Sequence, residues 1–259
     1  MRERHARDGA TDLLCAGAPA LARAAADTLP FDAFVLPWPR PEVRLMIADM
    51  DSTMITVECI DELADYAGVK PAVAEITERA MRGELDFEGA LRARVALLAG
   101  LPETVLARCQ AERVRLTPGA VTLVRTLAAR GVRTLLVSGG FTAFAEPVAA
   151  AIGFDGVRAN RLGIADGVLD GRVEEPILGA AAKRTALIET AAAMRIDLRE
   201  TVAIGDGAND IPMLETAGIG IAYHAKPRAA AAADLAVRFG DLTAVLHALG
   251  IDRREWHVG

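Results

Sequence analysis

The sequence has only three cysteines, no excess of positive charge and no long hydrophobic run. Cys15, Cys59 and Cys109 are odd in number, widely spaced and without metal-ligand spacing, so we expect reduced, packing cysteines in a cytoplasmic protein. A net charge of −6 and an isoelectric point near 5.3 exclude the basic footprint of a nucleic-acid or anionic-membrane binder. No internal repeat or transmembrane run is present, and 52% hydrophobic residues suffice for a sizeable core.

The N-terminal forty residues have some features of a secretory signal. Three arginines precede a short apolar stretch at 13–18, but Asp8 and Asp12 interrupt this pattern and the stretch is too short. We therefore predict a non-secreted segment, with an alanine-rich helix over 19–29 and a stiff proline-rich linker over 37–41.

Two aspartates follow an apolar run at residues 45–48. The run has the composition of a buried strand, and Asp49 and Asp51 come directly after it in the order Asp-Met-Asp-Ser-Thr. Carboxylates two residues apart, where a strand turns into a loop, can reach one small volume and take separate roles in one reaction. An Asp-rich turn that caps a helix, with Ser52 or Thr53 as the N-cap, is the other interpretation.

A second acidic loop follows a second apolar run. Residues 201–204 are strand-like, and residues 205–210 then read Gly-Asp-Gly-Ala-Asn-Asp. Such a loop indicates a site at the carboxyl edge of a parallel sheet, although alone it is also typical of a β-turn before a helix. If the two strands are neighbours, Asp206 and Asp210 join the first two aspartates. Four carboxylates so close together require a hard cation such as Mg²⁺.

A third strand-like run, residues 134–137, ends in Ser138-Gly139-Gly140. Glycine lets backbone N–H groups approach a ligand and Ser138 adds a hydroxyl donor, so this segment is a candidate phosphate cradle. Lys183 stands near the start of a predicted helix over 181–194 and would place a positive charge beside the same anion. By itself it would be a solvated lysine.

In this order, the four elements resemble the haloacid dehalogenase superfamily of phosphohydrolases. The closer resemblance is to the phosphoserine phosphatase family, and the joint pattern is far more specific than any single motif. The matching segments, spread over residues 43–247, are Ile47 to Thr53, Glu58, Met81 to Gly83 with Leu85, Phe87 and Arg94, Val137 to Phe141, Ala159 to Leu162, and Gly205 to Leu214.

The resemblance implies a mechanism. Asp49 would attack phosphorus and form an aspartyl-phosphate, whereas Asp51 would protonate the leaving alkoxide and then activate water. The resemblance also implies that Mg²⁺ is held by Asp49, the backbone carbonyl of Asp51 and Asp206, with Asp210 as a supporting acid. Ser138, Gly139 and Lys183 would neutralise the phosphoryl oxygens, and Asn209 would hydrogen-bond nearby.

Glu58 and Arg94 are the candidate residues for substrate choice. Phosphoserine carries an ammonium and a carboxylate, which a glutamate and an arginine match in charge. Without the resemblance, each would be a solvated charge on a helix. Met81 and Phe87 would wall the pocket by the same resemblance, although as bare residues both indicate core packing.

We predict an α/β fold, a doubly wound parallel sheet like that of the haloacid dehalogenases, with an inserted helical cap. Strands alternate with helices in the core, a turn at Asp166-Gly167 indicates a hairpin over 162–173, and four helical patterns fall in the insertion. The predicted domains are an N-terminal extension and linker at 1–42, a catalytic core at 43–56 and 117–259, and a specificity cap at 57–116.

Three functional hypotheses follow. The first is hydrolysis of O-phospho-L-serine, the last step of serine biosynthesis. The second is phosphotransfer to homoserine, or hydrolysis of another small phosphomonoester, which the sequence discriminates poorly from the first. The third is a phospho-accepting signalling module, but Asp51 counts against it because a receiver needs a long-lived phosphoaspartate. We expect a small phosphomonoester as the partner, no nucleic acid and no membrane, in a monomer or a homodimer.

Overall fold

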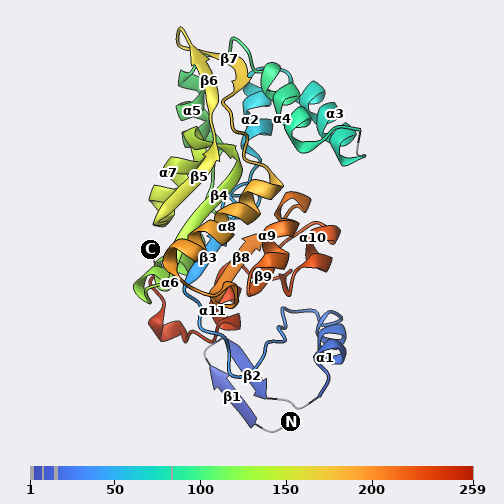
Figure 1. Ribbon diagram of the computed structural model, residues 1–259, viewed down its shortest axis with the longest axis vertical. Helices are drawn as coiled ribbons and strands as arrows, with labels where there is room; N and C mark the ends of the chain where they lie inside the picture. Colours follow the sequence, from blue (N-terminus) through green and yellow to red (C-terminus); the bar gives the residue numbers. More distant parts are fainter. Residues whose placement is uncertain (1–2, 8, 15–16, 83, 259) are drawn as a thin grey trace.

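The computed structural model describes residues 3–7, 9–14, 17–82 and 84–258. Its centre is one sheet of six parallel strands in the order β10-β9-β8-β3-β4-β5 (Figure 1). The strands are β3 (Leu45–Ala48), β4 (Arg133–Phe141), β5 (Gly156–Asn160), β8 (Thr201–Gly205), β9 (Ile219–Tyr223) and β10 (Leu235–Val237). The chain builds outward from β3 on one side and then on the other, which confirms the predicted doubly wound α/β fold.

Helices cover both faces of this sheet. Met46 and Ala48 of β3 lie in one core with α6 (Ala120–Ala129), α7 (Thr142–Ile152) and α11 (Thr243–Ala248). Leu45 and Ile47 point the other way, into a second core with α8 (Ala180–Met194) and α9 (Ile211–Thr216), and α10 (Pro227–Ala232) packs against α9 and β9. A strand covered on both faces needs apolar side chains at every position, which explains the continuous apolar run.

Of the helices between β3 and β4 in the chain, the first four stand beyond the carboxyl end of the sheet (Figure 1). They are α2 (Cys59–Tyr66), α3 (Lys70–Met81), α4 (Phe87–Ala96) and α5 (Thr104–Arg113). The predicted hairpin, β6 (Leu162–Ala165) and β7 (Val168–Val173), turns at Asp166 and Gly167, both with positive φ. The hairpin packs on α4, and Leu169 exchanges backbone hydrogen bonds with Gly100 and Leu101. A segment from later in the chain therefore packs against α4 and the loop that follows it.

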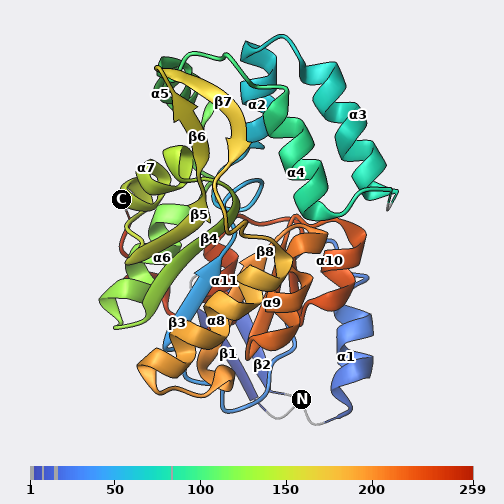
Figure 2. The same cartoon turned by 45° about the horizontal axis from the view of Figure 1, so that its top comes forward.

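The N-terminal segment lies at the end of the molecule opposite these helices (Figures 1 and 2). It contains a hairpin that the sequence analysis did not predict, in which β1 (Glu3–Arg7) pairs with β2 (Ala10–Leu14). The predicted alanine-rich helix is present as α1 (Pro19–Ala26), shorter than expected. Cys15 lies outside the described residues. In the described part of the chain, no helix has both the length and the apolar character needed to cross a membrane.

Candidate active site

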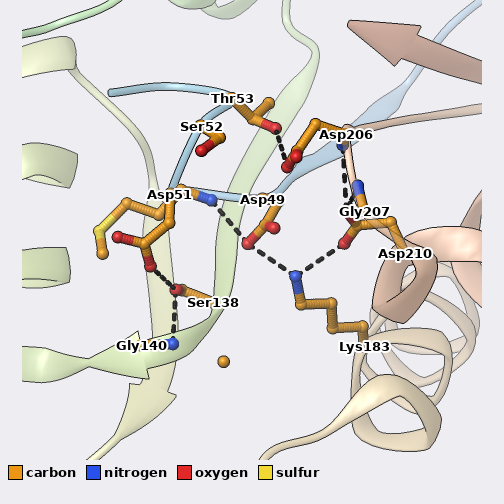
Figure 3. A network of polar contacts seen from close by, with 12 residues as sticks. Asp49, Asp51, Ser52, Thr53, Ser138, Gly140, Lys183, Asp206, Gly207 and Asp210 are labelled. Atoms are coloured by element: carbon orange, nitrogen blue, oxygen red, sulfur yellow. Dashed lines mark hydrogen bonds and ion pairs between the residues drawn. The ribbon is translucent and has the colours of Figure 1, made fainter. Parts of the chain in front are cut away.

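The carboxyl ends of three neighbouring strands bring the predicted acids together. Because β8, β3 and β4 are adjacent and parallel, the residues that follow them meet at one edge of the sheet. One carboxylate oxygen each from Asp49, Asp206 and Asp210 lies within 4.8 Å of the others, and all three residues are buried (Figure 3). The predicted convergence of the two acidic motifs is therefore present.

Lys183 reaches this cluster from the first turn of α8. Its side chain is fully buried, and Nζ lies 2.6 Å from Asp49 Oδ1 and 2.7 Å from Asp210 Oδ1 (Figure 3). Burial acts to lower the pKa of the ammonium, but Asp210 and Asp49 outweigh it and raise this pKa above its usual value. Lys183 is thus a permanent cation in the site, not the solvated lysine of the alternative interpretation.

The loop after β8 is closed by its own last aspartate. Asp210 Oδ2 accepts hydrogen bonds from the backbone N–H groups of Asp206 (3.1 Å) and Gly207 (2.9 Å), and a Cβ at Gly205 would collide with the Asp210 side chain. Asp206 Oδ1 accepts a 3.3 Å hydrogen bond from the buried hydroxyl of Thr53. The Gly-Asp-Gly-Ala-Asn-Asp spacing therefore fixes the direction of the Asp206 carboxylate.

Asp51 lies on the other side of Asp49, between the start of α2 and the end of β4. Its Oδ1 accepts from the backbone N–H of Cys59 (2.9 Å) and its Oδ2 from the hydroxyl of Ser138 (3.3 Å). That hydroxyl accepts in turn from the backbone N–H of Gly140 at 2.8 Å (Figure 3). The first motif and the candidate phosphate cradle are therefore joined through Asp51.

Burial shifts the acids of the site toward their protonated forms. It raises the pKa of Asp51 to about 6, with a further contribution from the nearby Glu58 carboxylate, and it raises the pKa of Asp206 to about 6 with help from Asp210. Burial and Asp210 also raise the pKa of Asp49, whereas Lys183 opposes them. One ammonium does not neutralise this group of carboxylates, so the site favours an additional cation.

The predicted substrate-reading residues lie at the same edge of the sheet. Glu58 is half-buried at the N-terminus of α2 and accepts a 2.7 Å hydrogen bond from Ser52, a residue with a φ of 55°. Arg94, half-buried on α4, has its pKa lowered by burial and feels the opposing charges of Asp61, Glu58 and Asp51. Both predicted charges are therefore close to the candidate acid, Asp51.

Three further predicted residues have different outcomes. The Phe87 ring covers the cradle, since a Cβ at Gly139 would lie 2.9 Å from its Cζ. Asn209 is half-buried beside Gly207, where a Cβ would collide with its Oδ1. The side chain of Met81 lies outside the described part of the structure.

Sequence reasoning assigned no role in the chemistry to four residues that contact this site, although Ser52 and Thr53 were candidate helix N-caps. Ser52 and Thr53 orient Glu58 and Asp206, and Cys59 donates its backbone N–H to Asp51. The two hydroxyl residues could have been found from the motif Asp-x-Asp-Ser-Thr, because they directly follow the second aspartate. Asn160, treated below, was part of a matched segment but had no assigned task.

The model of the haloacid dehalogenase-like hydrolases matches residues 46–215. The chain is 51% identical over 212 residues to a phosphoserine phosphatase of Streptomyces coelicolor, and the match covers 82% of this chain and 52% of the relative. It is 45% identical over 218 residues to a phosphoserine phosphatase of Albidiferax ferrireducens, with 82% of this chain and 92% of the relative covered. The chain belongs to the haloacid dehalogenase-like hydrolases and, within them, to the phosphoserine phosphatase family.

A solved structure of a substrate-bound phosphoserine phosphatase complex has the same fold. It superimposes with a TM-score of 0.75 at 40% identity and covers 80% of this chain and 99% of that one. The chain spans about half the length of the Streptomyces relative, which therefore contains segments without a counterpart here.

Proposed function

We propose that this protein is a Mg²⁺-dependent phosphatase that hydrolyses O-phospho-L-serine to L-serine and phosphate in the cytoplasm, at the end of serine biosynthesis. The observation that carries the proposal is the placement of the buried Asp49 and Lys183 and the half-buried Asp51 in one site, beside two opposite charges, Glu58 and Arg94. The family membership of the chain supports the same substrate.

Asp49 is the proposed nucleophile. Among the described residues, hydrogen bonds and ion pairs reach only its Oδ1, from Lys183 at 2.6 Å and the backbone N–H of Met50 at 2.8 Å. One oxygen is therefore anchored while the other is available to attack phosphorus and form the aspartyl-phosphate. Lys183 favours the ionised carboxylate that this attack requires.

Asp51 is the proposed acid and base. A pKa of about 6 lets this carboxyl carry a proton for the leaving serine oxygen and then accept one from the hydrolytic water near neutral pH. Its hydrogen bonds from Cys59 and Ser138 hold both oxygens in place. Ser138, the backbone of Gly139 and Lys183 would donate to the phosphoryl oxygens, with Asn209 nearby.

The donor set fits Mg²⁺, because the buried carboxylate oxygens of Asp49, Asp206 and Asp210 converge and hard oxygen ligands suit this ion. We assign Asp49, the backbone carbonyl of Asp51 and Asp206 as its ligands. Asp210 is a supporting acid, since it already holds Lys183 and two backbone N–H groups. The chemistry supplied by the bound ion is charge neutralisation at the transferring phosphoryl group.

Glu58 and Arg94 would bind the ammonium and carboxylate of the serine moiety, and Phe87 would close the pocket with Met81. Ser52 holds Glu58 by a 2.7 Å hydrogen bond, so the recognition carboxylate is preorganised by the residue next to Asp51.

A phosphate-release assay over phosphoserine, phosphothreonine, phosphohomoserine and sugar phosphates tests the proposal. We expect the highest kcat/KM for phosphoserine in the presence of Mg²⁺. Phosphothreonine adds a β-methyl group, phosphohomoserine is one methylene longer, and sugar phosphates lack both the ammonium and the carboxylate. Absence of phosphate release from all four classes would refute the phosphatase assignment. A clear preference for another substrate would refute phosphoserine alone.

A further inference from the structure

Asn160 is a buried amide at the end of β5, only 2% exposed, next to a break in the sheet. The β4–β5 ladder pairs Val137 with Arg158 and then Phe141 with Asn160. Residues 138–140, the candidate cradle, therefore bulge out of the ladder, and a bulge leaves backbone groups that need other partners. Gly140 N–H is satisfied by the Ser138 hydroxyl.

The Asn160 side chain provides a hydrogen-bond partner for the bulge and links the bulge to a second segment of the chain. Nδ2 donates to the carbonyl oxygens of Gly139 (2.8 Å) and Leu178 (3.1 Å), and Oδ1 accepts from the backbone N–H of Leu178 (2.6 Å). Both amide N–H groups and the amide oxygen are thus engaged. One side chain links the cradle on β4 to the residue just before the N-cap of α8.

That second segment carries Lys183. Gly179 is the N-cap of α8, and its carbonyl oxygen accepts the first-turn hydrogen bond from the backbone N–H of Lys183 at 3.1 Å. The Asn160 bonds therefore set the separation between the cradle and the helix whose lysine contacts Asp49.

Gly139 of the cradle and Gly179, the neighbour of Leu178, both lie against the ring of Phe87. A Cβ at Gly139 would lie 2.9 Å from Cζ of Phe87, and a Cβ at Gly179 would lie 3.0 Å from its Cδ1. The ring from α4 thus rests on both segments that Asn160 joins. A change in their separation would move the contact between α4 and the sheet.

We infer that Asn160 is a positioning residue, which holds the cradle bulge and the start of α8 at the spacing needed for phosphoryl transfer. This inference rests on the proposed function for its kinetic consequence, whereas its structural consequence is independent of any activity. Asn160 touches neither the nucleophile nor Lys183 through a described bond, so it acts through the backbone at Gly139 and Leu178.

The test compares Asn160→Ala with Thr134→Val. Thr134 is an equally buried residue at the opposite end of β4, and its hydroxyl bonds with Asp155 in the same region of sheet. Both changes delete buried hydrogen bonds, but only the first lies beside the site. Hydrogen–deuterium exchange should rise in both 139–141 and 178–183 for Asn160→Ala, and in neither for Thr134→Val.

Kinetics give the second measurement. At a temperature where both variants are fully folded, we expect kcat on phosphoserine and on p-nitrophenyl phosphate to fall by about 100-fold for Asn160→Ala, the scale of a misplacement near 1 Å. Thr134→Val should stay within about twofold of the wild type, since the two hydrogen bonds that it removes, both with Asp155, are distant from the site. The aryl phosphate tests the positioning role of Asn160 separately from the proposed phosphoserine phosphatase function. It reports phosphoryl transfer even if phosphoserine is not the natural substrate.

Asn160→Asp is the conservative variant and guards against a simple folding defect. Its ionised carboxylate would face two carbonyl oxygens, whereas the protonated form could donate to one of them. The ratio of its kcat to that of the wild type should therefore rise as pH falls. The inference is overturned if exchange in the two segments is unchanged by Asn160→Ala, or if kcat falls equally in Thr134→Val.

Discussion

At the scale of single residues, two aspartates of one motif differ in their surroundings. Asp49 is 4% exposed, and burial with the Asp210 charge raises its pKa, whereas the ammonium of Lys183 on its Oδ1 opposes this rise, as the proposed Mg²⁺ would. Asp51 lies near the Glu58 carboxylate, and burial with this charge raises its pKa to about 6. We propose that the partners divide the roles: Asp49, paired with Lys183, is the nucleophile, and Asp51, paired with no cation among the described residues, is the proton carrier.

Asp49→Asn tests the nucleophile. We expect a folded protein, because Lys183 keeps its ion pair with Asp210, and a loss of more than about a thousandfold in kcat, since an amide cannot attack phosphorus competently. Phosphate release by a sample verified as undeamidated is the measurement. Turnover at the wild-type rate would exclude the covalent mechanism.

The sequence predicted where the acids of the site meet but not how they are held. Asp49 and Asp206 each follow an apolar run, and adjacent parallel strands end at the same edge, so their convergence could be inferred. The bond from Ser52 to Glu58 depends on a φ of 55°, and the bonds of Asn160 depend on a bulge in β4. Neither backbone feature has a signature in the residue order, because both arise from tertiary packing.

At the scale of elements, the proposed function assigns substrate recognition to the segment from Glu58 to α4 and the chemistry to the ends of the strands. The proposed nucleophile and metal ligands follow strands, whereas Glu58 is the N-cap of α2 and Arg94 lies on α4. A substitution on these helices should therefore discriminate among substrates, and one at the strand ends should not.

Arg94→Ala tests this division. If Arg94 binds the serine carboxylate, kcat/KM for phosphoserine should fall by about 2–3 kcal/mol of transition-state binding, the scale of a charge-assisted hydrogen bond. Hydrolysis of p-nitrophenyl phosphate, which lacks a carboxylate, should change little. Arg92→Ala is the matched control on the same helix, because Arg92 is exposed and paired with Glu88 and Glu175. Equal losses on both substrates in Arg94→Ala would assign this residue to the fold.

The elements themselves were predicted where hydrophobic periodicity is strong. The six strands of the core sheet and the helices between them follow apolar runs and helical patterns. The β1–β2 hairpin was missed because its short strands carry charged and polar residues and, among the described residues, form a separate two-stranded sheet. The packing of β6–β7 on α4 could not be predicted from the sequence either, since nothing within residues 162–173 specifies which element the hairpin packs against.

Asp32→Ala tests how the N-terminal segment is attached. The Asp32 carboxylate accepts hydrogen bonds from the backbone N–H groups of Arg238 (2.7 Å), Phe239 (3.2 Å) and Gly240 (2.8 Å), beyond the end of β10. Losing them should weaken attachment by about 1.5–3 kcal/mol and speed tryptic cleavage before residue 45, with kcat unchanged. Asp27→Ala, which removes an exposed pair with Arg238, should have a smaller effect. Equal protection from trypsin in both variants would contradict this anchor.

At the scale of the whole molecule, the acids of the site link stability to pH. The pKa values of Asp51 and Asp206 are each raised to about 6 in the fold. Since an unfolded aspartate titrates near about 3.9, the folded state binds more protons between these two pKa values. The free energy of unfolding of the metal-free protein should therefore fall as pH rises from about 4 to about 6.

Mg²⁺ should reverse this loss, because a cation stabilises the ionised carboxylates and competes with their protons. Unfolding in urea, with EDTA or with Mg²⁺, is the measurement. At an ion concentration about 100-fold above Kd we expect a gain of about 2.7 kcal/mol at pH 7.5 and a much smaller gain at pH 5. Asp206→Asn should flatten the pH dependence and remove most of the gain at pH 7.5, because it takes away a titrating group and a proposed ligand together. A gain equal at both pH values, or retained in full by Asp206→Asn, would place the ion elsewhere on the protein.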